Sequence, residues 1–136
     1  MDLSALDTSK AAEQGAKLHL RHPTEDYPIT DNGKKDGQPV TITLIGADSE
    51  TFRRFSQSQM DRRLKAASKR QYTSAAAEED ATDLLVACTV GWGNIELDGK
   101  DLPFSKENAK LLYDRLPWVK EQVGAFIGER ANFLKA

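Results

Sequence analysis

The stretch from Asp83 to Phe104 constrains the fold of this chain more than any other part of it. Its first half carries apolar residues at helical spacing: Leu84, Leu85, Cys88 and Trp92. Gly91 and Gly93 flank the tryptophan, and glycine adopts without steric cost the left-handed backbone angles at which many helices end. We therefore expect a helix that ends around Trp92, with the large indole covered by a returning loop.

The second half of the stretch supplies that loop. Asp98-Gly99 predicts a tight turn, and Phe104 brings another aromatic ring just before Ser105, where a new helix is expected to begin. The stretch contains no reactive constellation, so we interpret it as a folding nucleus. The residues expected in the structural core around it are Trp92, Phe104, Trp118, Leu85 and Cys88.

The region before this stretch begins with a strand pattern. Residues 1–16 are small and polar, and either form a loose helical turn or stay mobile. Leu18 and Leu20 then alternate with polar residues until Pro23, and apolar and polar residues alternate again from Val40 to Ile45. Asn-Gly and Asp-Gly steps between the two segments favour a hairpin. Residues 17–46 are therefore predicted to form a small antiparallel hairpin or three-stranded meander.

Residues 48–136 are predicted to be mostly helical. Asp48 or Ser49 can cap a helix over Glu50–Gln71, because a short side-chain oxygen accepts a hydrogen bond from a first-turn N–H. A second helix is expected from Thr73 or Ser74, and Pro117 fits the first turn of the last helix. We therefore predict one α+β domain over residues 1–136, with the small antiparallel sheet followed by three or four helices.

The long helix is predicted to have two unlike sides. Its apolar residues spread over about half of the circumference: Phe52, Phe55, Met60, Leu64 and Ala67. Basic residues gather on the opposite side, which is expected to face away from the core: Arg54, Arg62, Lys65 and Lys69. From Arg53 to Arg70 there are seven basic residues and a single acid, Asp61, in a chain whose net charge is only −2.

Composition favours a cytoplasmic globular protein. The 136 residues are enough for one domain with a core. Charged residues make up 29% and hydrophobic residues 39%, which is above the apolar content of a disordered chain. One cysteine cannot form an intramolecular disulfide and suits a reducing compartment. No apolar run approaches the roughly 18 residues of a membrane span, so we expect no membrane association.

The sequence contains no catalytic or metal-binding pattern. His19 and His22 are expected on opposite faces of a strand, and no second cysteine is present to complete a zinc site. Cys88 lies on an apolar helix face, where an inert thiol is the expected state. Gly91-Trp92-Gly93 lacks the Lys-Ser/Thr ending of a phosphate-binding loop. We expect a protein that is not an enzyme, with no cofactor, no metal site and no catalytic residue.

Several segments resemble the tail assembly chaperones of long-tailed, siphovirus-type bacteriophages. They cover most of the chain after about residue 38: Thr41–Glu50, Trp92 with Ile95–Gly99, Leu102–Ala109, Trp118–Val123, Phe126–Ile127 and Asn132–Phe133. The resemblance implies a non-enzymatic factor in the host bacterial cytoplasm that binds the tape measure protein, keeps it soluble and helps recruit tail tube subunits. The implied partners are the tape measure and tail tube proteins, and a second copy of the chain is a further candidate.

Two surfaces are candidates for contact with a client protein. The first is on the last helix, where Phe126, Phe133 and Leu134 belong to a narrow apolar stripe, although core packing explains these residues equally well. The second is the basic side of the long helix, which suits an acidic partner. Nucleic acid binding through Arg53–Arg70 is the alternative function, and it is less favoured because charge alone is weak evidence and no exposed aromatic residues accompany it.

Overall fold

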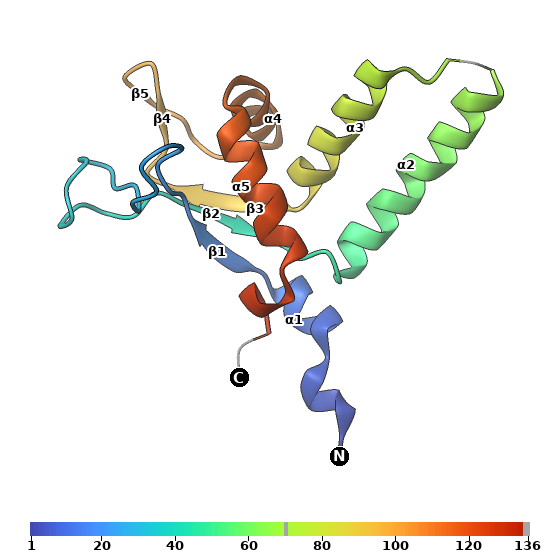
Figure 1. Ribbon diagram of the computed structural model, residues 1–136, viewed down its shortest axis with the longest axis horizontal. Helices are drawn as coiled ribbons and strands as arrows, with labels where there is room; N and C mark the ends of the chain where they lie inside the picture. The colour runs from blue at the N-terminus through green and yellow to red at the C-terminus, as the bar shows by residue number, and fades with distance from the viewer. Residues whose placement is uncertain (70, 135–136) are drawn as a thin grey trace.

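The computed structural model describes residues 1–69 and 71–134, and these form an α+β fold (Figure 1). A three-stranded antiparallel sheet has the order β1 (Ala16–His19), β2 (Thr41–Leu44) and β3 (Thr89–Gly93). Leu18 lies opposite Ile42, which in turn lies opposite Trp92. The predicted alternation is confirmed, because Leu20, Val40, Ile42 and Leu44 are all buried.

The prediction of a helix that ends at Trp92 is wrong. Helix α3 (Ser74–Ala87) stops at Cys88, and Trp92 belongs to strand β3. Two β-branched residues, Thr89 and Val90, follow the helix and favour an extended backbone. That backbone also has a partner in the central strand β2, which satisfies its hydrogen-bonding groups. The sheet therefore takes its third strand from the part of the chain that was predicted to be helical.

Residues 17–46 contribute two strands of the sheet and a long connection. The predicted antiparallel pairing of β1 with β2 is confirmed. The alternative of a complete three-stranded meander within residues 17–46 is wrong, since the connection forms only isolated bridges, Arg21 with Pro28 and Thr30 with Pro39. Gly33 has a φ of 73° in this connection, which agrees with the expected Asn-Gly turn.

The predicted helix starts are confirmed because each depends on local chemistry. Ser49 caps α2 (Glu50–Ser68), Thr73 caps α3 and Ser105 caps α4 (Lys106–Arg115), each through its side-chain oxygen. Pro117 occupies the first turn of α5 (Pro117–Gly128). Helix α2 ends at Ser68 rather than at Gln71. Arg70 lies outside the described residues.

Short elements complete the chain. At the N-terminal end, the 3-10 helix η1 (Leu3–Leu6) leads into α1 (Thr8–Gln14), where Ala12 is buried. Strands β4 (Glu96–Leu97) and β5 (Lys100–Asp101) pair through the predicted turn, in which Asp98 and Gly99 both have positive φ. The 3-10 helix η2 (Arg130–Asn132) follows α5.

The core lies between one face of the sheet and helices α4 and α5. Figure 1 shows α5 lying across this face, and Val119, Val123 and Ile127 are its buried residues. A buried polar pair joins the two layers, since the hydroxyl groups of Thr89 and Tyr113 are 2.7 Å apart. Within residues 1–69 and 71–134, no helix is long and apolar enough to cross a membrane.

Candidate functional site: the outer surface of helix α2

Helix α2 packs against α3 and α1, and Gln59 is its one fully buried residue. The Gln59 side-chain amide donates a 2.6 Å hydrogen bond to the Asp80 carbonyl of α3. Arg63 also faces α3, where its Nε lies 3.5 Å from Asp80 Oδ2 and its guanidinium covers the Tyr72 ring. Polar groups on α3 therefore fix which side of α2 faces inward.

This rotation of α2 leaves an apolar stripe in solvent. Met60 is 54% exposed and Leu64 is 66% exposed. With the exposed Ala67 they follow an i, i+4, i+7 spacing, which places all three on one side of a helix. The prediction that these three residues face the core is wrong, because Gln59 and Arg63 occupy that position. We call Met60, Leu64 and Ala67 the apolar stripe.

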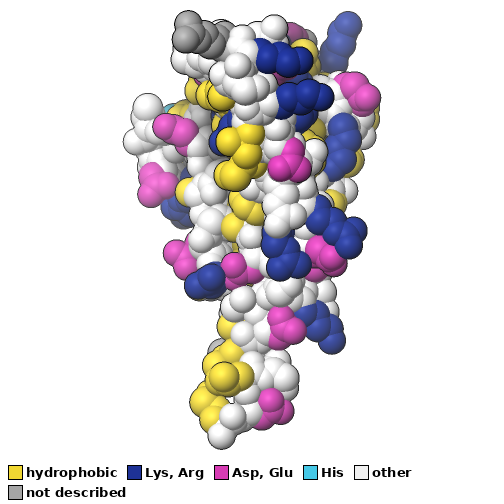
Figure 2. All heavy atoms as spheres, turned by 90° about the vertical axis from the view of Figure 1, so that its right-hand side faces the viewer, with side chains coloured by type: hydrophobic (Ala, Val, Ile, Leu, Met, Phe, Trp, Pro, Cys, Tyr) yellow, Lys and Arg dark blue, Asp and Glu magenta, His cyan; other side chains and the backbone are white. Residues whose placement is uncertain are grey.

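Basic side chains occupy the rest of the exposed surface of α2, mostly on the side away from the apolar stripe. Figure 2 looks onto this side of the molecule and shows hydrophobic side chains in the middle of the face, with Lys and Arg side chains around the upper part. Arg54 pairs with Glu50 at 2.6 Å. Among the described residues, no carboxylate lies within 4.0 Å of four other basic side chains on α2 or at its C-terminal cap: Arg53, Arg62, Lys65 and Lys69. We call these four residues the cationic group.

The prediction that Phe126, Phe133 and Leu134 share one helix is wrong, because α5 ends at Gly128 and Phe133 and Leu134 follow η2. Phe133 is only 9% exposed, and its ring contacts that of Phe126 edge to face at 5.4 Å between centroids. Gly46 leaves the space that this ring occupies, since a Cβ there would lie 2.9 Å from it. Leu134 is half-buried. Packing within the molecule therefore uses most of this apolar surface.

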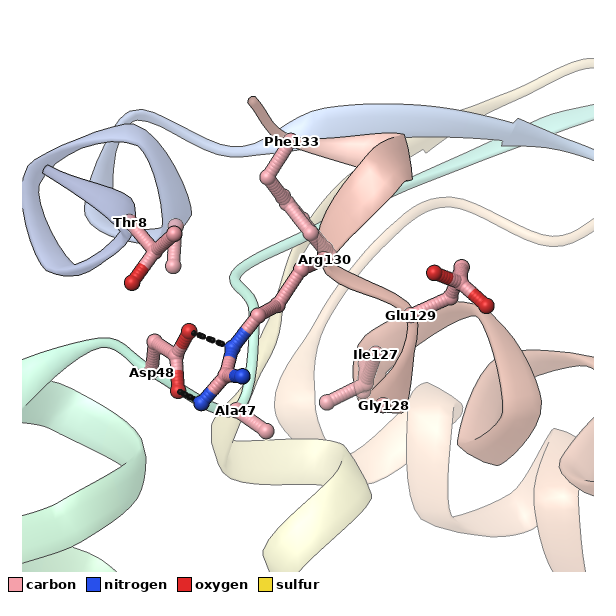
Figure 3. A pocket seen from close by; sticks show the side chains of 9 residues that line it. Thr8, Ala47, Asp48, Ile127, Gly128, Glu129, Arg130 and Phe133 are labelled. Atoms are coloured by element: carbon pink, nitrogen blue, oxygen red, sulfur yellow. Dashed lines mark hydrogen bonds and ion pairs between the residues drawn. The ribbon is translucent and has the colours of Figure 1, made fainter. Parts of the chain in front are cut away.

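The turn that carries Phe133 borders a hollow of about 360 Å³ (Figure 3). Asp48 and Arg130 face each other there, with Oδ2 of Asp48 2.6 Å from Nε of Arg130. Hydrogen bonds from Arg130 and Thr8 hold the pKa of Asp48 below its usual value. Both charges are thus already matched within the hollow, and the pair ties η2 to the segment that precedes α2.

The predicted core residues cluster as expected, although they are not equally buried. Cys88 is fully buried, and burial raises the pKa of its thiol to about 11, which makes it a poor nucleophile at neutral pH. Trp92 is half-buried, donates a 2.8 Å hydrogen bond to the Leu102 carbonyl and contacts Phe104 edge to face. Leu85 and Trp118 also pack at the margin of the core.

The two histidines form separate local contacts. Nε2 of His19 lies 2.7 Å from the carbonyl oxygen of Ile29, and the ring of His22 stacks on Tyr27. In the described part of the chain, no group of three or more histidine, cysteine, aspartate or glutamate side chains is placed to hold a metal ion.

No protein-family model, no curated protein and no solved structure matches this chain. An exposed apolar strip on an otherwise polar helix is the arrangement that protein-binding helices present to a partner.

Proposed function

We propose that this chain is a non-enzymatic assembly chaperone for the tail of a long-tailed bacteriophage. In this proposal it binds the tape measure protein in the host cytoplasm, keeps it soluble and helps recruit tail tube subunits around it. The support comes from the resemblance carried by segments such as Leu102–Ala109 and from the surface of α2. The observation that carries the proposal is the exposed apolar stripe, because the core does not use these side chains.

The apolar stripe suits a client that must later be released. Covering one large aliphatic side chain completely contributes about 1.5–3 kcal/mol. Met60 and Leu64 together therefore supply less than the roughly 8 kcal/mol of a micromolar complex, even before the entropic cost of association is counted. A client helix laid on α2 is held by this contact only in combination with others, so a tube subunit can displace it.

The cationic group adds a preference for an acidic client. Arg62, Lys65 and Lys69 are exposed and have no carboxylate partner among the described residues. Acidic residues of a client that reaches around α2 from the apolar stripe would pair with them and orient the client. Such exposed pairs contribute little affinity, about 0–1 kcal/mol each, and so act mainly on orientation and association rate.

Nucleic acid binding is the second candidate, and the same unpaired cations favour it. The large exposed apolar residues of α2, however, are Met60 and Leu64, which are aliphatic and offer no stacking surface for bases. Phosphate contacts release counterions, so DNA affinity would fall steeply with salt. A client protein held mainly by apolar contact would stay bound at high salt.

Co-expression tests the proposed function. A tape measure segment expressed alone should aggregate, because its apolar helical faces have no partner in water. Co-expression with this protein should keep the segment soluble as a complex that survives gel filtration in high salt and after nuclease treatment. If no segment of the cognate tape measure becomes soluble while the chaperone itself is folded, the proposed function is wrong. Loss of all binding in high salt would favour the nucleic acid alternative.

A further inference from the structure

Strand β1 forms one edge of the three-stranded sheet. In the order β1-β2-β3 it has a neighbouring strand on one side only (Figure 1). The N–H of Leu20 donates a 3.0 Å hydrogen bond to the carbonyl of Val40, toward the β2 side. Backbone groups alternate in direction along an antiparallel strand. The N–H and C=O groups of Leu18 and Leu20 therefore point toward β2, and those of Lys17 and His19 point out of the sheet.

The next outward-facing residue, Arg21, shows what this edge binds. Its N–H donates a 2.9 Å hydrogen bond to Oε1 of Gln122, and its carbonyl accepts a 2.8 Å hydrogen bond from Nε2 of the same side chain. The Gln122 amide on α5 thus takes the place of an opposing residue in an antiparallel ladder. Among the described residues, none outside the sheet makes a hydrogen bond to the backbone of Lys17 or His19. The edge is closed at Arg21 and open before it.

Two hollows lie along the open part of this edge, between β1 and the segment that runs from α5 to η2. The first has a volume of about 610 Å³ and is bordered by residues 14–17. The second has a volume of about 520 Å³ and is bordered by Leu18 and Arg21. Phe126 and Asn132 line both hollows. The edge therefore has space beside it, and Phe126 offers an apolar surface there.

The solvent side of β1 is basic. Lys17, His19 and Arg21 alternate with Leu18 and Leu20, which face the core, so the three share the opposite face. Arg21 pairs with Asp26 at 2.7 Å, whereas no carboxylate in the described part of the chain lies within 4.0 Å of Lys17. A second copy of β1 added here would place basic residues opposite basic residues, which is destabilising. A strand with acidic residues at these positions would be attracted.

We propose that the open edge of β1 binds an extended segment of a partner protein as an antiparallel fourth strand. The segment carries acidic residues opposite Lys17 and His19 and an apolar residue between them, opposite Leu18. Residues directly opposite each other share a face of the sheet. The acidic side chains therefore lie beside Lys17, and the apolar side chain lies on the side of Phe126. Main-chain hydrogen bonds supply the affinity, and the alternate side chains supply the specificity.

This binding site is separate from the surface assigned to a client helix. None of the residues that line the two hollows belongs to α2. A helical segment on the apolar stripe and an extended segment on β1 can therefore be held at the same time. The inference does not rest on the proposed function, because it uses no contact of α2.

A synthetic peptide tests the site directly. The probe is a seven-residue peptide in which glutamate alternates with valine, titrated into the isotope-labelled full chain and followed by NMR. The amide resonances of Lys17 and His19 should shift, and their hydrogen exchange should slow. The amide of Leu18 should change little, because it already faces β2. A peptide with lysine in place of glutamate should bind at least about fivefold more weakly at low salt.

Methylation of the peptide backbone separates strand addition from a contact of side chains alone. In an antiparallel pair, the glutamates opposite Lys17 and His19 direct their N–H groups at β1. N-methylation of the glutamates removes these donors and should abolish binding. N-methylation of the valines, whose N–H groups point away from β1, should leave binding intact.

A charge reversal tests the specificity. Lys17→Glu should reverse the preference, so that the lysine peptide binds more tightly than the glutamate peptide. Lys100→Glu is the matched control, since Lys100 is an exposed lysine on strand β5 and borders neither hollow. It should bind both peptides as the wild type does. Circular dichroism melts confirm that both variants are folded.

Three results would overturn this inference. Unchanged amide resonances of Lys17 and His19 at millimolar glutamate peptide would show that the edge accepts no strand. Equal effects of the two N-methylations would show that the peptide does not pair with the backbone of β1. Shifts centred on another element would place the binding site there. None of these measurements contains a tape measure segment, so failure of the proposed function leaves them interpretable.

Discussion

At the scale of single residues, solvent exposure distinguishes apolar positions that look alike in the sequence. Phe133 and Leu64 both lie in amphipathic patterns, yet Phe133 fills the space beside Gly46 and Leu64 has no contact that covers it. A side chain that already packs within the fold can reach a client only if that packing is lost. The structure therefore moves the candidate contact surface from the end of the chain to α2.

Replacement of these two residues should have unequal effects on stability. Phe133→Ala should lower the free energy of unfolding by about 3 kcal/mol, because it removes a buried aromatic ring. Leu64→Ala should change it by no more than about 0.5 kcal/mol, as exposed positions do. Denaturant midpoints measure both changes. A Phe133→Ala protein that unfolds at the wild-type midpoint would show that the ring is not packed and would return the last turn to the candidate surfaces.

At the scale of elements, the features that depend on neighbouring residues could be predicted from the sequence, and those that depend on long-range contacts could not. The caps Ser49, Thr73 and Ser105 and the helix start at Pro117 were predicted because each acts on neighbouring residues. Strand β3 was missed because its partner β2 lies about 50 residues earlier in the chain. The helical periodicity that extended to Trp92 carried no information about that partner.

The orientation of α2 was missed for a related reason. A hydrophobic projection favours Met60 and Leu64 as inward residues, but the helix turns Gln59 inward to bond the Asp80 carbonyl. That carbonyl belongs to another helix and leaves no trace in the α2 sequence. As a result, the basic half of the candidate surface could be predicted from the sequence and the apolar half could not.

The ion pair between Asp48 and Arg130 predicts a pH dependence for the docking of η2. The pair holds the folded-state pKa of Asp48 below its ordinary value of 3.8. Its contribution to stability should therefore be complete well above pH 3.8, from about pH 5 upward, and should disappear as the pH falls through the folded-state pKa. The contribution is small, because Arg130 is largely exposed.

Unfolding of the wild type and of Asp48→Asn at a series of pH values measures this contribution. The difference in unfolding free energy between the two proteins should be constant from pH 7 to about pH 5 and should shrink below that range. Subtracting the variant removes the effects of other acids such as Asp98, whose pKa is also lowered, by Arg115. A difference that grows on acidification would contradict the assigned ion pair.

At the scale of the whole molecule, the described surface combines a packed core with two exposed apolar regions. The core between the sheet, α4 and α5 uses the large side chains in the middle of the fold. Leu3 and Leu6 at the N-terminal end and the apolar stripe of α2 remain outside it and are exposed. A protein that must bind a client, hold it in solution and release it has a use for surfaces of this kind.

The central claim is that the apolar stripe binds a partner protein, and isothermal titration with a tape measure peptide short enough to stay soluble alone tests it most directly. The stripe variant, Met60→Gln with Leu64→Gln, should lose at least about tenfold in affinity, which corresponds to 1.4 kcal/mol. A Leu111→Gln control, which changes an exposed leucine on α4, should bind like the wild type, and the wild-type affinity should persist in high salt. Equal affinities of the wild type and the stripe variant would contradict the account.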